Sequence, residues 1–300
     1  MEKAILRTLI YADIFDYPLK AQEIQKWLIR RKATLWQAAK VLDKLKKNSK
    51  LEIKCGYYFL PKRAGLMGIR KRREEESKSY LRKAKFFSRL LKIIPWIKLV
   101  GISGGLALNN AAKADDIDIA VITAKGRLWI CRLFILGLLS LVGQRRVKKD
   151  TGKKIAGKFC VNILLEEDRL EQKNKDIYVA HEVLQMKVLW QRDGIYSRYL
   201  EDNAWVFEFL PNWIYEDVVS SEYYVLMEKT GKSRNSHNTK YIIHNTILDR
   251  LENLAKWLQL KIMQTPKGME RIEDGALYFH PQDCRLKVLK EYKKQLQKLS

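Results

Sequence analysis

The chain has 300 residues, which is enough for two or three domains and too many for one small module. Its 47% hydrophobic and 31% charged residues are typical of a soluble globular protein and exclude disordered, collagen-like and membrane-embedded chains. The net charge of +24 favours polyanionic partners, and residues 1–100 carry most of it, with 26 basic and 9 acidic side chains.

The cysteine spacing and the apolar segments indicate a cytoplasmic protein. The four cysteines form no C-x-x-C pair, so the sequence predicts neither a disulfide framework nor a zinc ribbon. The N-terminus lacks the apolar segment and cleavage site of a secretory signal. The longest apolar stretch, Leu128–Val142, contains Arg132 and is shorter than the roughly 20 residues of a spanning helix. We therefore expect a buried helix there and no membrane contact.

The first 64 residues have the pattern of three short helices followed by a hairpin. Apolar residues at helical spacing predict helices over Ile5–Phe15 and Ala21–Arg31. Thr34 and Gln37 form a T-x-x-Q capping box that starts the third helix. Alternating residues around the Cys55-Gly56 turn predict the hairpin. This order resembles a winged helix-turn-helix.

A winged helix-turn-helix implies DNA or RNA contact through the basic N-terminal third, with the third helix in the groove. The alternative is a small helical module whose lysines are solvated, because winged helices also bind proteins. From Gly68 to Trp96 the sequence predicts a basic connecting helix in which Arg70–Arg73 precede Glu74–Glu76. Opposite charges at this spacing stabilise a helix by about 0.2 to 0.5 kcal/mol per pair.

A glycine turn follows the next expected strand, Ile97–Ile102. Ser103, Gly104 and Gly105 interrupt the strand before a helical pattern starts at Leu106. Two glycines allow a tight turn and a close approach of the backbone to a ligand, and free N–H groups at a helix start favour an anion. A phosphate could bind there, although glycine pairs in turns are common for steric reasons alone.

Two aspartates mark the start of a second apolar strand, Asp115–Ile122. Because side chains in a strand alternate between faces, Asp116 and Asp118 project on the same side, opposite Ile117. Adjacent carboxylates repel each other without a cation, and Mg²⁺ prefers oxygen ligands. The spacing therefore predicts a divalent metal site, with solvated acids at a strand end as the alternative.

Together, the string from Leu99 to Thr123 resembles the nucleotidyltransferase superfamily that includes DNA polymerase beta. Gly104 and Gly105 stand at that family's hG[GS] positions, and Asp116 and Asp118 stand at its two metal-binding positions after the expected gap. The resemblance implies an enzyme that transfers a nucleoside monophosphate from a nucleoside triphosphate such as ATP and releases pyrophosphate.

The resemblance also implies roles for the residues around the motif. Two Mg²⁺ or Mn²⁺ ions roughly 3.5 to 4 Å apart would be bridged by Asp116 and Asp118. Ser103 and the glycine turn would hold the triphosphate, and Lys113 is close enough in sequence to add positive charge. The catalytic residues implied by the resemblance are therefore the two aspartates.

The sequence departs from the family pattern at two positions. Gly105 replaces the more usual serine and removes a hydroxyl that could bind phosphate. Asn162, in the apolar strand from Lys158 to Leu165, stands where the third family carboxylate is expected. Its amide oxygen can bind a metal, but it cannot serve as a base. Glu166, just beyond the strand, is a weak substitute because one or two residues of displacement move it several Å from the metals.

The remainder of the chain is predicted to be mostly helical. Amphipathic stretches span Val179–Trp190, Thr246–Met263 and Leu286–Leu299, and the second places Leu251 and Leu258 on its apolar stripe. A basic cluster that includes Arg145, Arg146, Lys148 and Lys149 follows the expected helix over 127–142. We interpret this cluster as a favourable helix end, with triphosphate or nucleic-acid binding as the alternative.

We expect an α+β protein with an N-terminal winged helix over residues 1–64, a connecting helix over 65–95, a small mixed-sheet nucleotidyltransferase core over 96–170 and a helical domain over 171–300. The leading hypothesis is a Mg²⁺-dependent nucleotidyltransferase with a hydroxyl acceptor. The alternative is a non-enzymatic nucleotide- and nucleic-acid-binding protein on a degenerate transferase fold. The sequence leaves the acceptor open, so it could be a nucleic acid, a small molecule or a protein hydroxyl.

Overall fold

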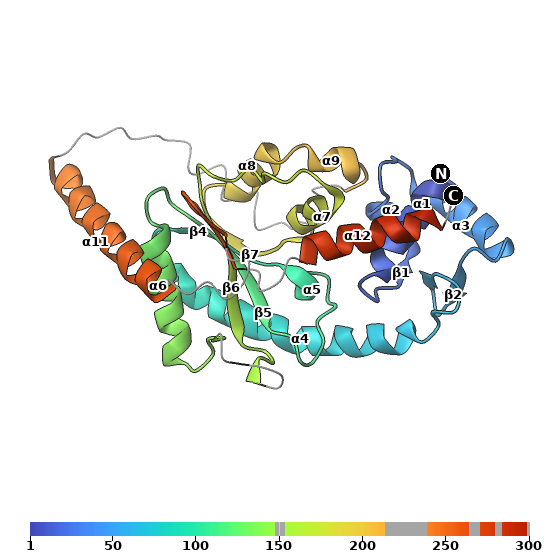
Figure 1. The fold of residues 1–300 in the computed structure, drawn as a ribbon, viewed down its shortest axis with the longest axis horizontal. Coiled ribbons are helices and arrows are strands. Elements are labelled where there is room, and N and C mark those ends of the chain that lie inside the picture. The colour runs from blue at the N-terminus through green and yellow to red at the C-terminus, as the bar shows by residue number, and fades with distance from the viewer. Residues whose placement is uncertain (148–149, 151–153, 214–238, 264–270, 280–283, 299–300) are drawn as a thin grey trace.

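The protein is described by a computed structural model that covers residues 1–147, 150, 154–213, 239–263, 271–279 and 284–298, and the side chains of residues 239–245 are outside this description. It is an α+β fold with one sheet of three strands and one of six (Figure 1). Lys148 and Lys149 of the basic cluster lie outside the described residues.

The N-terminal part has the helix, strand, helix, helix and hairpin order that is typical of a winged helix. Its elements are α1 (Glu2–Asp13), β1 (Leu19–Lys20), α2 (Ala21–Lys26), α3 (Leu35–Lys47), β2 (Glu52–Lys54) and β3 (Tyr57–Phe59), and the antiparallel strand order is β1-β3-β2. The Thr34 hydroxyl accepts the Gln37 N–H at 3.2 Å, and the Gln37 side chain accepts the Thr34 N–H at 3.0 Å. The expected capping box is therefore confirmed.

The connecting helix α4 (Leu66–Leu90) continues into a 3-10 turn, η1 (Leu91–Ile93), and passes beneath the six-stranded sheet (Figure 1). The basic residues Arg70–Arg73 of α4 do not form only a solvated surface. Arg70 is 4% exposed, and its guanidinium contacts Glu23 at 2.9 Å and Glu74 at 2.7 Å. The guanidinium also lies 3.8 Å from the centre of the Tyr17 ring. Arg70 therefore fixes the helix against the N-terminal module.

The six-stranded sheet carries the glycine turn and the aspartates. Its strands are β4 (Ile97–Ile102), β5 (Ile117–Thr123), β6 (Phe159–Glu166), β7 (Lys187–Gln191), β8 (Arg271–Glu273) and β9 (Ala276–Tyr278), in the order β7-β4-β5-β6-β9-β8. Only the β5/β6 pair is parallel among these strands. The helices around it are α5 (Gly104–Ala107), α6 (Leu128–Leu141), α7 (Ile177–Gln185), α8 (Ile195–Asp202), α9 (Val206–Phe209), α11 (Thr239–Met263) and α12 (Cys284–Gln297).

Each face of this sheet covers a separate apolar core. Ile117, Ile119 and Val121 pack in a core with residues of α4 and α6, whereas Ala120 and Ile122 pack in a core with residues of α7 and α8. This alternation along β5 places Asp118 on the α7 side. The expectation that Asp118 lies on the face opposite Ile117, Ile119 and Val121 is therefore confirmed.

After residue 170 the described chain is mostly helical, as expected, but it also contributes three strands to the six-stranded sheet. The stretch Val179–Trp190 changes from helix to strand, because α7 ends at Gln185 and β7 then pairs antiparallel with β4. Strands β8 and β9 also come from this part of the chain, and β9 pairs with β6. Pairing with β7 and β9 gives hydrogen-bond partners to the backbone N–H and C=O groups at the outer edges of β4 and β6, which a packed helix cannot do. The division of the chain at 170/171 stays a prediction, but the sheet takes strands from both sides of it.

Helix α11 forms as expected, but it packs through the face that carries Glu252, Ala255 and Gln259 rather than through the predicted apolar stripe. The Glu252 carboxylate accepts the N–H groups of Trp129 and Ile130 at 2.7 and 2.9 Å, at the start of α6. Gln259 donates to the Trp129 carbonyl at 2.8 Å. Residues of the stripe are exposed instead, including Leu251 at 47%. The carboxylate therefore accepts hydrogen bonds from backbone N–H groups in the first turn of α6 that have no partner within that helix. These bonds fix the orientation of α11.

Helix α6 is buried on one side, as the apolar run predicted, with Cys131, Ile135 and Leu139 fully covered. In the part of the chain that the structure describes, no helix combines the length and apolarity that a membrane span requires.

Candidate functional site

The glycine turn lies directly against Asp118. The N–H of Ser103 donates to the Asp118 carbonyl at 3.1 Å, which brings the turn to the start of β5. Gly104 has a φ of +65°, and a Cβ at this position would lie 3.1 Å from Asp118 Oδ2. A Cβ at Gly105 would lie 3.3 Å from the Asn110 carbonyl oxygen. Both positions therefore favour glycine, for backbone conformation at Gly104 and for space at both. Helix α5 is a single turn of four residues, and phosphate binding at its start stays a prediction.

Asp116 and Asp118 come together as expected, and a cysteine joins them. One ligand atom from each of Asp116, Asp118 and Cys160 lies within 4.8 Å of the other two. Cys160 stands opposite Asp118 in the parallel β5/β6 register. Sequence analysis missed Cys160 because the pattern identified the strand but not its register with β5. Burial and the neighbouring Asp116 carboxylate raise the pKa of Asp118 well above its usual range.

An arginine from the basic cluster also belongs to this site. The Arg146 guanidinium forms an ion pair and a hydrogen bond with Asp116 Oδ2, and the Asp116 side chain is only 15% exposed. The Arg146 N–H donates to the Phe159 carbonyl at 2.9 Å, so the backbone of β6 positions this residue. Arg146 therefore contacts the aspartate pair rather than only marking the end of α6.

Two of the predicted ligand-binding residues have buried oxygen atoms without hydrogen-bond partners. Asn162 and Ser103 are 5% and 4% exposed, and neither Asn162 Oδ1 nor Ser103 Oγ is bonded within the described structure. Asn162 occupies a bulge of β6, where the register with β5 shifts between Ile119 and Ala120. Buried polar atoms are almost always paired, so these oxygens are available to a ligand.

Among the described residues, neither Lys113 nor Glu166 makes a hydrogen bond or ion pair with the aspartate pair. Lys113 is exposed, and its carbonyl, rather than its ammonium group, accepts the Tyr80 hydroxyl at 2.7 Å. Glu166 pairs with Thr123 at the far end of β5 from Asp118. Burial raises the pKa of Glu166, and the N–H groups of Gly126 and Leu128 oppose that shift by hydrogen bonding to its carboxylate. Glu166 is therefore held at the start of α6 and does not replace the third carboxylate.

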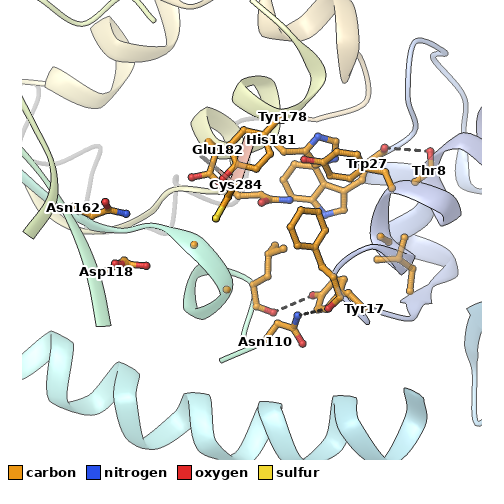
Figure 2. A pocket seen from close by; sticks show the side chains of 18 residues that line it. Thr8, Tyr17, Trp27, Asn110, Asp118, Asn162, Tyr178, His181, Glu182 and Cys284 are labelled. Atoms are coloured by element: carbon orange, nitrogen blue, oxygen red, sulfur yellow. Dashed lines mark hydrogen bonds between the residues drawn. The ribbon is translucent and has the colours of Figure 1, made fainter. Parts of the chain in front are cut away.

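A cavity of about 250 Å³ opens beside Asp118 and Asn162 (Figure 2). Most of its lining comes from the N-terminal module, from the glycine turn with the segment after it and from α7, and Cys284 of α12 completes it with the two strand residues. Figure 2 shows Glu182, His181 and Tyr178 of α7 above the cavity, with Trp27 behind them. Sequence analysis missed this wall because no local motif indicates that α7 and the N-terminal module meet at the aspartates.

His181 and Glu182 of α7 differ in their surroundings. His181 Nδ1 lies 2.9 Å from the Ile177 carbonyl, and its ring stacks on Tyr11 at 4.0 Å and on Trp27 at 5.6 Å. Burial lowers the pKa of His181 to about 4, so the ring is neutral near pH 7. Burial raises the pKa of Glu182 to about 7. Among the described residues, no hydrogen bond or ion pair holds the Glu182 carboxylate.

Substitution of Gly104 by alanine should disrupt the aspartate pair. Gly104→Ala forces a side chain into the left-handed region, at a cost of about 1 to 2 kcal/mol, and its Cβ must displace the Asp118 carboxylate. We expect a lower melting temperature and at least about tenfold weaker Mn²⁺ binding by calorimetry, equivalent to about 1.4 kcal/mol.

Gly126→Ala is the matched control for this substitution. Gly126 has a φ of +64° and nothing within 4 Å of an added Cβ, so the variant carries the same backbone strain without touching Asp118. It should lose stability and keep Mn²⁺ affinity. Equal Mn²⁺ affinities in the two variants would contradict the close contact between Gly104 and Asp118.

The raised pKa of Glu182 predicts a pH-dependent stability. A carboxyl with a pKa of 4.5 in the unfolded chain and about 7 in the fold stabilises the fold below about pH 4.5 and loses that contribution as pH rises through 7. Glu182→Gln removes the titrating carboxyl and therefore this loss of stability at high pH. We expect its unfolding free energy, relative to wild type, to rise by about 2 kcal/mol between about pH 5 and about pH 8, measured by urea denaturation. A constant difference over this range would contradict the burial of an unpaired carboxylate.

Comparisons with known proteins give little further information. No family model matches the sequence, and no curated protein matches it. Among solved structures, the chain is similar to one described as a toxin-antitoxin with AMP-PNP, at 16% sequence identity and a TM-score of 0.22, over 52% of this chain and 95% of that one. This TM-score is too low to show a shared fold, so the proposals below rest on the residues of this chain.

Proposed function

We propose that this protein is a divalent-metal-dependent nucleotidyltransferase that transfers a nucleoside monophosphate from a nucleoside triphosphate to a hydroxyl acceptor. The observation that carries the proposal is the convergence of Asp116 and Asp118 beside the Gly104 turn, with Asp118 also bordering a cavity. The sequence resemblance to nucleotidyltransferases supports the same reading, because it rests on these residues.

The donor set fits a divalent cation. Two carboxylates supply hard oxygen ligands, and Asn162 has a buried amide oxygen without a partner next to them on β6. The Cys160 thiol is a soft donor that does not suit Mg²⁺ or Mn²⁺, and burial raises its pKa, so the ligands would be the carboxylate and amide oxygens. When bound, such a cation would supply positive charge that offsets the charge developing on the phosphate oxygens.

The residues of the chain orient these groups and balance their charge. The Gly104 turn and the Ser103 N–H fix the position of Asp118, and the Arg146 guanidinium offsets the charge of Asp116. In the transfer, the acceptor oxygen forms a bond to the α-phosphorus while the bond from that phosphorus to the bridging oxygen breaks. Pyrophosphate leaves with the electron pair, and the hydroxyl proton passes to water.

Neutralising either aspartate should abolish transfer. Asp116→Asn and Asp118→Asn keep the side-chain size and remove the charge that binds a cation, so pyrophosphate release with Mg²⁺ or Mn²⁺ should fall on the order of a hundredfold or more. The assay combines each nucleoside triphosphate with fractions of nucleic acid, protein and metabolites, because the acceptor is unidentified.

Asp115→Asn is the control for this experiment. The Asp115 carboxylate is exposed and accepts the Ala112 N–H at 2.8 Å, so it belongs to a turn beside the pair and not to the pair. The control should keep most of the wild-type rate. Equal rates for wild type, Asp116→Asn and Asp118→Asn would remove the aspartates from the reaction and overturn the proposed function.

A second candidate function is nucleic-acid binding without catalysis, and the surface of α3 favours it. Trp36 is 72% exposed, and the ammonium group of Lys40 lies 5.5 Å from the centre of its ring. Lys46 and Lys47 are exposed on the same helix. An exposed aromatic ring among basic residues is typical of surfaces that bind phosphate backbone and stack on bases.

Salt dependence tests this second function. We expect the affinity for a short DNA duplex or for RNA of the same sequence to fall steeply with salt, and Lys40→Ala to reduce the slope of log K against log salt by about 1. Lys78→Ala is the control, because this exposed lysine already contacts Glu75 at 2.7 Å. A shallow slope in wild type, or equal slopes in both variants, would argue against the second function.

A further inference from the structure

The cavity beside Asp118 has an unusual charge for this protein. Although the whole chain carries a net +24, the described residues that line the cavity include no lysine or arginine. Its ionisable acids are Asp118 and Glu182. A triphosphate would meet these carboxylates with no basic side chain to offset its charge, so the cavity does not suit the nucleotide's phosphates.

Two of the polar groups that line the cavity carry unpaired hydrogen-bond acceptors. Asn162 is 5% exposed, and its Oδ1 has no partner in the described structure. The Glu182 carboxylate also makes no hydrogen bond or ion pair with the described residues, and Figure 2 shows it above the cavity. Because an acceptor left unpaired is costly, a complementary ligand must bring donors.

The walls between these acceptors are aromatic. Tyr11, Phe15 and Trp27 line the cavity from the N-terminal module, and Tyr178 lines it from α7. The faces of such rings attract cations, by about 0.5 to 2 kcal/mol for each well-placed ring. His181, which stacks on Tyr11 and Trp27, is neutral near pH 7 and therefore does not repel a cation.

The size of the cavity limits what can occupy it. Its volume of about 250 Å³ is below the roughly 300 to 1,000 Å³ of sites for drug-sized ligands. A duplex or a folded protein domain cannot enter, whereas one compact organic molecule can. Because Asp118 borders the cavity, a hydroxyl of that molecule would be next to the aspartate pair.

We propose that this cavity is the acceptor site and that it selects a small organic cation, which carries a protonated amine for Glu182 and a hydroxyl for transfer. The role of acceptor rests on the proposed nucleotidyltransferase function. The preference for a cation rests only on the lining of the cavity, which has carboxylates and aromatic rings and, among the described residues, no lysine or arginine. It can therefore be tested without nucleotide, metal or turnover.

The test compares three probes of nearly the same shape: tyramine, which is cationic, tyrosol, which is neutral, and 4-hydroxyphenylacetate, which is anionic. Binding to the full chain is measured by ligand-detected NMR at about pH 8, where Glu182 is ionised and the amine is protonated. We expect tyramine to bind at least about tenfold more tightly than tyrosol, equivalent to about 1.4 kcal/mol, and 4-hydroxyphenylacetate to bind most weakly. Equal affinities for tyramine and tyrosol would overturn the proposal.

Two variants test whether the preference for tyramine over tyrosol arises in the cavity. Glu182→Gln removes the charge, and Gln185→Lys places an ammonium group three residues along α7, where it can neutralise Glu182. Each should reduce the advantage of tyramine over tyrosol to about twofold or less. Glu201→Gln, at an exposed carboxylate of α8, is the control and should keep the advantage.

The outcomes separate this proposal from the proposed function. A tyramine preference that persists in both Glu182→Gln and Gln185→Lys would place the cation elsewhere and overturn the site. If the preference depends on Glu182 but Asp116→Asn leaves pyrophosphate release unchanged, the cavity binds a cation and the transferase function fails. If the aspartates control the rate and tyramine shows no preference, the transferase stands and the cation site fails.

Discussion

The site depends on holding two carboxylates next to each other in a partly buried place. Burial and mutual repulsion both oppose the ionised form of such a pair, as the raised pKa of Asp118 indicates. Three features of the structure act against this cost. Arg146 offsets the charge of Asp116, the Ser103 N–H fixes the start of β5, and Gly104 leaves room for the Asp118 carboxylate. Arg146 offsets one of the two negative charges, and the proposed divalent cation would offset the charge that remains.

The features that could be predicted from the sequence depend on residues close together in the chain. Thr34 and Gln37 cap a helix because they are three residues apart, and the bounds of β4 follow from one short apolar run before the glycines. The alternation of Asp118 with Ile117 and Ile119 is a property of any strand. In each case, the physical cause acts over a few residues, so a single sequence contains it.

The features that could not be predicted depend on register and on packing between distant segments. Cys160 joins the aspartates because β6 is parallel to β5 in one register, and a bulge then turns Asn162 to the cavity. Glu182 reaches the same cavity only because α7 packs over the sheet. The apolar stripe of α11 is exposed, and the Trp129 and Ile130 N–H groups of α6 donate to the Glu252 carboxylate on another face of the helix. A hydrophobic pattern indicates which face can be buried, and it does not include the unpaired donors of a neighbouring helix.

The N-terminal module is part of the site, whatever its surface binds. Tyr11 and Trp27 stack on His181 of α7, and the Asn212 side chain accepts the Ala33 N–H at 2.9 Å while donating to the Gln25 carbonyl at 2.8 Å. These contacts cross from the first 64 residues to the segment after the sheet core. Trp27 is the residue at which α2 ends, and its side chain also lines the cavity. The module therefore cannot move away from α7 without opening the cavity to water. Water would weaken the interaction between a bound cation and Glu182, since charges attract less strongly in a high dielectric. The position of the N-terminal module and the affinity of the cavity are therefore linked by the same aromatic contacts.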